Sequence, residues 1–310
     1  MLPPWVELSM DVNIMTKFLE ASRHLAHLKG FVDMLPDREL CVNALIYKEA
    51  AASCAIDGIK ESDPLVGKYR EILQKRSQDA IAGYRLTEED VLDIYSELDL
   101  EDGRSRSEEI PSQTACMTQF LKSGYGFPKD PLLRMALGQY QLEATQPFRA
   151  DDGRAGRLIS IVYLIQEGLL GQPSLCLSAY HLQKAGEYAE GLKSVSASRN
   201  WNKWVIYILD SISSASDYTV SLILRIQALK EKIEAVIRDN DLQADRMDIS
   251  ALFGIPYISP RKLMSGSIKS VNTAKKYLGQ LEQLGILSKT MAGREYVWVN
   301  TGLMEILSEV

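Results

Sequence analysis

The sequence predicts a mainly α-helical protein with a small mixed module of helices and strands at its C-terminal end. From about residue 12 to residue 240, apolar residues recur at intervals of three and four, which is the period of one helix face. The alternation of apolar and polar residues that is typical of half-buried strands is nearly absent from this stretch. The pattern changes after the polar segment DNDLQAD at 239–245, which we interpret as a linker.

Two helix faces stand out within the helical part. The one near the N-terminus comprises Ile14, Phe18, Ala21, Leu25 and Leu28, and the one near the middle comprises Leu132, Ala136, Tyr140 and Glu143. Glycine and proline disfavour a continuing helix, so we expect breaks at Gly30, Leu35–Pro36, Gly103 and 124–128. The last long helix is expected between Tyr218 and about Arg238.

The C-terminal segment carries the signals of short helices and a β-hairpin. ISALFGI at 249–255 predicts a short helix, and PYIS at 256–259 predicts a brief strand. Ser259 is a candidate N-cap for one further helix, and Ser270 is a candidate N-cap for the next, which Gly285 ends. ILSKTMAGREYVWVN at 286–300 predicts two strands around a turn. This order of elements resembles a winged helix-turn-helix.

Charge separates the C-terminal module from the rest of the chain. The formal net charge of −6 argues against a nucleic-acid-binding surface spread over the whole protein. From Arg246 onward, however, eight basic residues stand against five acidic ones, a net +3 that leaves −9 for the remainder. Lys269, Lys275 and Lys276 lie at the start and outer side of the second predicted helix, where a recognition helix faces phosphates. Two interpretations stay open: these lysines lie on a solvated helix face in a small dimerisation module that forms a homodimer, or the module binds DNA through them.

Composition and cysteine usage favour a globular protein of the cytoplasm. The 310 residues, 46% hydrophobic and 25% charged, fit a globular chain of about two domains. The first residues lack a basic region followed by an apolar one, and no stretch approaches about eighteen apolar residues. We therefore expect neither a signal peptide nor a membrane span. The four cysteines stand alone without metal-binding spacing, which favours a reducing compartment and no zinc site.

The three histidines and two neighbouring tryptophans offer little chemistry. His24 and His27 are three residues apart on one predicted helix, but no third ligand has a suitable spacing. We interpret both as surface or partly buried histidines. His181 is interpreted as a packing or surface residue, and Trp201 and Trp204 as core residues.

The loop PFRADDGRAGR at 147–157 precedes a helix that is apolar nearly all round and therefore predicted to be buried. It holds Gly153 and Gly156 between Arg154 and Arg157. Glycines and arginines at the start of a buried helix are typical of a site that holds phosphate. The alternative is that Asp152 is a plain N-cap paired with Arg154.

The segment YQLEATQPFRADDGRAGRL at 140–158 resembles the motif HPFxDGNGRxxR of the Fic family and the helix that precedes it. The matching residues are Glu143, Pro147, Phe148, Gly153, Arg154, Gly156 and Arg157. GLLGQPSLCLSAY at 168–180 and NWNKWVIYIL at 200–209 are similar to family sequences as well. The resemblance spans nearly the whole chain. It implies a Fic-fold helical bundle followed by a winged helix: an N-terminal helical segment at 1–105, a Fic core at 106–240 and a winged-helix domain at 245–310.

The resemblance also implies a chemistry that this chain has lost in part. In the family, the motif histidine takes a proton from a target hydroxyl, which attacks the α-phosphate of ATP and receives AMP. Gln146 stands at the histidine position, and Ala150 stands where an acid holds magnesium. A glutamine amide does not titrate near neutral pH, and general-base catalysis is commonly worth about 10²–10⁴-fold. The sequence therefore predicts a pseudoenzyme, adenylyltransferase-like but with impaired or absent AMP transfer.

Part of the nucleotide site keeps the residue types of the family. Binding of a nucleotide or another anion is predicted at Gly153, Arg154, Gly156 and Arg157, with ATP and magnesium bound weakly or not at all. One alternative is an active nucleotidyl- or phosphotransferase in which Asp151 or Asp152 holds the metal, since magnesium favours carboxylate oxygens. Another is a DNA-associated regulator that acts through the winged helix.

Two further features bear on regulation and on a protein target. Ser53-Cys-Ala-Ile-Asp57-Gly58 resembles the inhibitory segment of the family, Ser/Thr-x-x-x-Glu-Gly/Asn, whose glutamate pairs with the second motif arginine. Asp57 could pair with Arg157, although its side chain is one methylene shorter; the alternative is a structural ion pair that holds two helices together. The segment at 99–109 is too short for the hairpin that holds a target chain in this family. We therefore expect strand-wise docking of a protein target to be lost or reduced.

Overall fold

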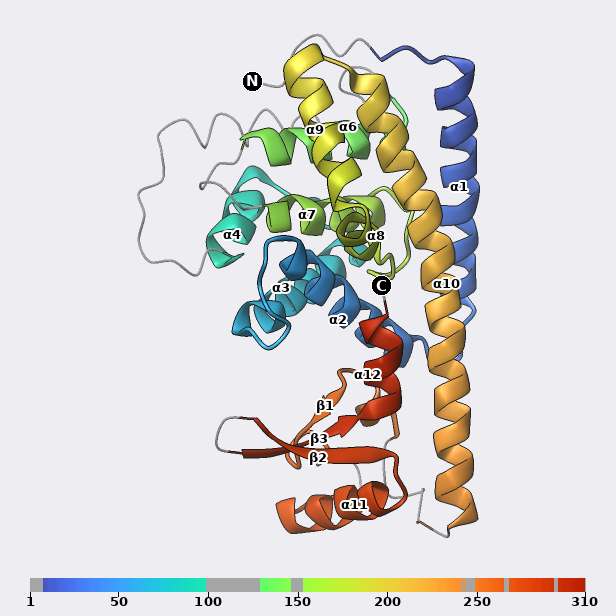
Figure 1. Cartoon of the computed structure of the whole chain (residues 1–310), viewed down its shortest axis with the longest axis vertical. Helices are drawn as coiled ribbons and strands as arrows, with labels where there is room; N and C mark the ends of the chain where they lie inside the picture. The colour runs from blue at the N-terminus through green and yellow to red at the C-terminus, as the bar shows by residue number, and fades with distance from the viewer. Residues whose placement is uncertain are drawn as a thin grey trace. The chain divides into compact units, whose positions relative to one another are not determined.

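A computed structural model describes residues 8–98, 129–145, 153–240, 242, 249–264, 268–292 and 295–309 of the chain. Within these residues, helices dominate and one small three-stranded sheet is present, which confirms the mainly α prediction (Figure 1). The chain divides into two compact units, Met1–Met34 with Lys48–Thr219 and Leu35–Tyr47 with Val220–Val310. The predicted functional segments 1–105, 106–240 and 245–310 stay a prediction.

The first unit is built from helices. It contains α1 (Val12–Asp33), α3 (Pro64–Ile81), α4 (Glu88–Leu98), α6 (Pro131–Thr145), α7 (Gly153–Gln166), α8 (Leu177–Gln183) and α9 (Ala185–Ser198). Two longer helices, α2 (Arg38–Ile56) and α10 (Trp201–Asp239), contribute residues to both units.

Helix α7 is the centre of the first unit. Every residue from Gly153 to Ile165 is buried, as the apolar composition of this segment predicts. Helices α3, α4 and α6 pack against it (Figure 1). The start of α7 is therefore surrounded by protein, and any charged side chain there needs a partner within the fold.

The helix boundaries follow local capping signals more closely than glycine positions. The Asp11 carboxylate accepts a hydrogen bond from the backbone N–H of Ile14 and caps α1. The predicted break at Gly30 is wrong, because α1 continues to Asp33, while the break at Leu35–Pro36 is confirmed. Helix α10 begins at Trp201, well before the predicted start at Tyr218. The breaks predicted at Gly103 and 124–128 lie outside the described residues.

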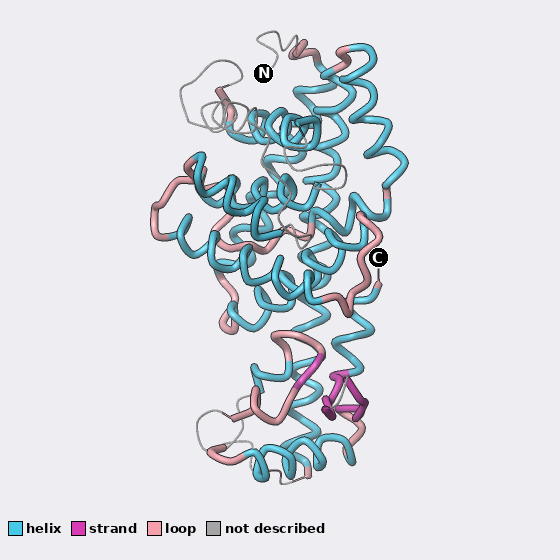
Figure 2. Tube along the Cα trace, turned by 90° about the vertical axis from the view of Figure 1, so that its left-hand side faces the viewer, coloured by secondary structure: helices cyan, strands magenta, loops and turns pink. Residues whose placement is uncertain are grey.

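The C-terminal part of the second unit contains the predicted helix and hairpin. Its elements are η2 (Ile249–Leu252), β1 (Tyr257–Ile258), α11 (Val271–Gln283), β2 (Leu287–Ala292), β3 (Glu295–Asn300) and α12 (Thr301–Ser308). The strands, magenta in Figure 2, form an antiparallel sheet in the order β1-β3-β2, with Ser288 opposite Val299. The Ser270 hydroxyl accepts from Thr273 N–H at 3.1 Å, and Gly285 follows the helix with a φ of 71°, as the caps predict.

Two elements of the C-terminal module differ from the prediction. The segment that begins at Ser259 forms a hydrogen-bonded turn rather than a helix in the residues described, with Lys262 and Leu263 donating to the Ser259 carbonyl. Helix α12 was not predicted, although its cap is visible in the sequence: the Asn300 side chain accepts from Leu303 N–H at 3.1 Å. Across the described part of the chain, every helix is either too short or too polar to cross a bilayer.

Candidate functional site

The glycine–arginine segment forms the first turn of α7, which brings Gly153, Arg154, Gly156 and Arg157 together in the first unit. Gln146, Asp151 and Asp152 lie outside the described residues, so their predicted roles stay predictions. The site that can be described is therefore the helix start and the side chains packed around it.

Arg157 is a fully buried guanidinium with partners on three sides. Its side chain is only 1% exposed. Nε donates to the Ser53 hydroxyl at 2.8 Å, and Nη2 donates to the Ser53 carbonyl at 2.9 Å and to Asp57 Oδ2 at 3.0 Å. Nη1 lies 3.8 Å from Glu143 Oε1. Helix α2 and the turn after it thus fasten the side chain by charge-assisted hydrogen bonds.

A single carboxylate oxygen joins both arginines. Asp57 Oδ2 is 3.0 Å from Arg157 Nη2 and also 3.0 Å from Arg154 Nη1. The predicted pairing of Asp57 with Arg157 is confirmed, whereas its contact with Arg154 was not predicted. Gly58 follows Asp57 directly and has a φ of 75°, a conformation that glycine adopts readily.

Glu143 on α6 supplies a second carboxylate. Its Oε1 accepts a hydrogen bond of 2.5 Å from the Tyr188 hydroxyl on α9. The absence of a side chain at Gly153 makes room for this arrangement: a Cβ there would lie 2.4 Å from Arg157 Nη1 and 2.7 Å from Glu143 Oε2. Gly156 is tight as well, since its Cβ would lie 3.1 Å from Leu142 Cβ. The two motif glycines are therefore explained by packing within the described residues.

The electrostatics of this cluster are those of buried, mutually paired charges. Burial lowers the pKa of the Arg157 guanidinium, but the carboxylates of Glu143 and Asp57 outweigh it and the net pKa is raised. Burial raises the pKa of the Asp57 carboxyl, against the pull of both guanidinium groups. Burial also raises the pKa of Glu143. Two cations, Arg154 and Arg157, face two carboxylates, so the cluster is close to neutral as it stands.

Glu49, on α2 one turn before Ser53, is also buried. It accepts hydrogen bonds from the Ser178 backbone N–H at 2.9 Å and from the Ser178 hydroxyl. Burial raises its pKa to about 7. This carboxyl caps the first turn of α8 and is close to its titration point at neutral pH.

The histidines occupy the places expected of structural residues. His181 is fully buried between Tyr188 and Tyr207, and its Nδ1 is 2.9 Å from the Tyr207 hydroxyl. Burial lowers the pKa of His181 to about 3, so the ring is neutral at physiological pH. His24 is half-buried, with its Nδ1 2.7 Å from Asp217 Oδ1, and His27 is exposed. Among the described residues, no three histidine, cysteine or acidic side chains form a metal-binding group.

The thiols of the described part are buried. Cys41, Cys54 and Cys176 are free cysteines, and each is at most 1% exposed. Burial raises the pKa to about 11 for Cys41 and Cys54 and to about 12 for Cys176. These thiols are protonated and shielded, so none is a candidate nucleophile.

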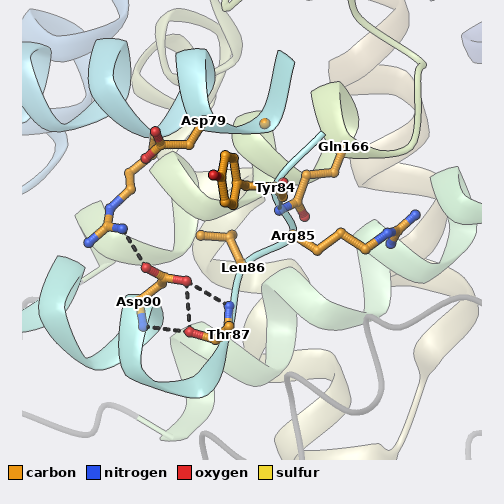
Figure 3. Close-up of a pocket in the computed structure, with 9 residues that line it drawn as sticks. Asp79, Tyr84, Arg85, Leu86, Thr87, Asp90 and Gln166 are labelled. Carbon is orange, nitrogen blue, oxygen red and sulfur yellow. Dashed lines mark hydrogen bonds and ion pairs between the residues drawn. The ribbon is translucent and has the colours of Figure 1, made fainter. Parts of the chain in front are cut away.

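A separate cavity of about 240 Å³ lies between the end of α3 and the start of α4 (Figure 3). Of the polar side chains that line it, Arg76 donates to Asp90 at 2.5 Å, and Arg85 donates to Glu167 at 2.7 Å. None of the motif residues lines it. The cavity therefore does not extend the arginine site.

The predicted DNA-contacting residues lie in the second unit. Lys269, Lys275 and Lys276 are all exposed, the first just before α11 and the others in its second turn. Ala274, Leu278 and Leu281 form the buried face of α11, whereas Val271 is 38% exposed.

Both ends of the chain match known protein families. Residues 229–303 match the family model for the C-terminal domain of SoFic-like protein adenylyltransferases, so the chain has adenylyltransferase-like domains. Residues 15–91 match the N-terminal domain of the Fic/DOC family. A Fic family protein from Desulfovibrio desulfuricans G20 shares the fold, with a TM-score of 0.54 and 15% identity over 96% of this chain and 98% of that chain. The chain is a Fic family protein.

Proposed function

We propose that this protein is a Fic-domain pseudoenzyme whose transfer of AMP from ATP to a protein hydroxyl is impaired or absent. The observation that carries the proposal is the shared oxygen of Asp57, which lies 3.0 Å from a guanidinium nitrogen of both Arg154 and Arg157. The groups that suit a phosphate are occupied by a carboxylate of the chain itself. Gln146 adds a second obstacle, because its amide cannot take a proton from an incoming hydroxyl.

The arginine site suits an anion only after Asp57 moves. Guanidinium groups bind carboxylate and phosphate in the same geometry, so the two compete for Arg154 and Arg157. With Asp57 in place, a triphosphate would add negative charge beside Asp57 and Glu143, which repel it. ATP, with magnesium supplying charge neutralisation of its phosphates, would be held by Arg154 and Arg157 once they are released. Asp151 and Asp152 stay the predicted metal ligands.

Radioactive labelling with α-³²P-ATP tests the loss of transfer. We expect the native protein to incorporate little or no label into itself or into an added extract, and Gln146→His combined with Asp57→Asn to incorporate more. Label on the native protein at the rate of the doubly substituted protein would overturn the proposal and would favour the active transferase that uses Asp151 or Asp152.

Calorimetric titration tests the occupied site separately from the chemistry. We expect Asp57→Asn to bind ATP at least about tenfold more tightly than the native protein, and the further substitution Arg154→Ala to remove that gain. Glu71→Gln, which neutralises an exposed carboxylate on α3, is the matched control and should behave as the native protein. Equal affinity of native protein and Asp57→Asn for ATP, with and without magnesium, would contradict an internally occupied site.

A further inference from the structure

In the second unit, α11 buries one face and leaves the opposite face open. Ala274, Leu278 and Leu281 point into the module and are buried. Asn272, Lys276 and Gln283 recur at intervals of four and seven on the opposite side of the helix and are exposed. The outward face is therefore polar throughout and carries amide and ammonium groups that can donate hydrogen bonds.

The charge around this face is positive and is not neutralised nearby. Lys269, Lys275 and Lys276 are exposed and make no ion pair with the residues that the structure describes. The one acid of α11, Glu282, lies near the end of the helix, where its Oε2 accepts from Trp298 Nε1 at 3.0 Å. The three cations at and just before the first half of the helix outnumber this acid and attract a polyanion.

Gly279 provides an observation that is independent of charge. It lies in the interior of α11, where glycine destabilises a helix relative to alanine. A Cβ at this position would meet nothing within 4 Å, so packing inside the chain does not require glycine there. Gly279 lies one turn after Lys275 and Lys276, on the outward side, and leaves the helix backbone open to close approach by a ligand.

The hairpin beside α11 adds a further cation. Lys289 on β2 is exposed, with its Nζ 4.3 Å from the centre of the Tyr296 ring on β3. This cation–π contact holds the ammonium group on the hairpin while leaving its charge in place. Helix α11 packs against β2 within the module, so Lys289 lies on the strand next to this helix (Figure 1).

We propose that α11 binds in the major groove of double-stranded DNA, with Lys269, Lys275 and Lys276 against phosphates and Lys289 on the hairpin against the flanking backbone. The major groove of B-form DNA, about 12 Å wide, admits an α-helix, and an asparagine at the start of that helix can pair with adenine. Asn272 occupies that place. Duplex RNA fits less well, because its major groove is too narrow and deep for side chains to read.

Fluorescence anisotropy with the full chain and a mixed-sequence DNA duplex of about two helical turns tests this inference. We expect binding at about 50 mM salt that weakens linearly in log–log form as salt is raised. Lys275→Gln/Lys276→Gln should reduce the slope by about two, because each phosphate contact contributes about one. Lys75→Gln/Lys193→Gln, which removes two exposed lysines of the first unit, is the matched control and should leave the slope unchanged.

Gly279→Gln tests the close approach without changing charge. The substitution adds a long neutral side chain in open space, so the folded module should be unaffected while DNA affinity falls by roughly tenfold or more. Thermal unfolding of the variant separates a misfolded module from a blocked surface. The inference is overturned if the native chain fails to bind duplex DNA at low salt, if the lysine variant keeps the native slope, or if polyglutamate or duplex RNA binds more tightly than DNA.

Discussion

The arginines at the start of α7 and the lysines of α11 are both clusters of cations on helices, and they differ in what neutralises them. Arg154 and Arg157 are buried, and each is paired with Asp57 at 3.0 Å. Lys275 and Lys276 are exposed and unpaired among the residues that the structure describes. A buried cation must find its counter-charge within the chain, whereas an exposed one is stabilised by water and stays available to a partner.

The difference predicts where charge contributes to stability and where it is free for binding. Removing one member of the buried cluster leaves its partners charged and unpaired in a low-dielectric environment. Removing an exposed lysine only changes the surface potential.

Arg157→Ala should lower the free energy of unfolding by about 3–5 kcal/mol, because Glu143 is left buried without its guanidinium partner and Asp57 keeps only Arg154. Urea unfolding followed by tryptophan fluorescence measures the loss, since Trp204 is fully buried in the first unit. Arg23→Ala on the exposed side of α1 is the control and should change the value by less than about 0.5 kcal/mol. If Arg157→Ala does not fold, Arg157→Met/Asp57→Asn should recover part of the stability. A loss below about 1 kcal/mol for Arg157→Ala would mean that the buried charges do not depend on one another.

Glu49→Gln should change how stability depends on pH. Burial raises the pKa of Glu49 from 4.5 to about 7, so between these values the folded state binds more protons than the unfolded state. The contribution of Glu49 to the free energy of unfolding therefore falls as pH rises through this window, by up to about 3 kcal/mol. The difference between native protein and Glu49→Gln, measured by urea unfolding at several pH values, isolates this fall. His181 acts in the opposite sense, with a pKa lowered to about 3, but it is present in both proteins and cancels. A difference that is constant with pH would contradict the prediction.

Gly153→Ala should destabilise the first unit by about 1–3 kcal/mol, because the new methyl group would displace Arg157 or Glu143 from their pairing. Gly186→Ala in α9 is the matched control: its Cβ would meet nothing within 4 Å, and alanine favours a helix. Thermal unfolding of the two variants side by side gives the comparison. Equal midpoints for both variants would show that the space at position 153 is not needed.

Lys275→Gln/Lys276→Gln should alter the free energy of unfolding by less than about 0.5 kcal/mol, since exposed and unpaired side chains contribute little to stability. Thermal unfolding measures this on the same sample that is used for DNA binding. A large loss of stability would indicate a structural role for these lysines. It would contradict the difference in stability contribution between them and the arginine cluster.

Local signals made much of the fold predictable. The three- and four-residue period identified the helical part, and the Ser270 cap, the φ of Gly285 and the two strands of the hairpin depend on neighbours in sequence. The prediction of helix boundaries was wrong where a local signal did not decide the structure. Gly30 is accommodated inside α1, and the turn after Ser259 does not extend into a helix in the described residues.

The candidate site was predictable in its residue types and in the pairing of Asp57 with Arg157, which the resemblance to the Fic family implied, but not in its other contacts. The glycines and arginines of α7 were identified from the sequence, but Ser53 and Arg157 are separated by 104 positions. The hydrophobic periodicity of a sequence does not indicate a contact between residues so far apart. The hydrogen bond from Tyr188 to Glu143 joins α9 to α6 and had no sequence signal. Side-chain pairing of this kind depends on how helices pack, which the pattern of one helix does not specify.

The buried thiols give this protein a set of internal reporters. Cys54 follows Ser53 directly, so it lies on the same turn of α2 that holds Arg157, and its protonated sulfur is shielded from solvent. A maleimide or disulfide reagent can reach that sulfur only when the fold opens around it. The rate of labelling at Cys54, measured by mass spectrometry in the chain without substitutions, therefore reports how often the surroundings of the arginine open.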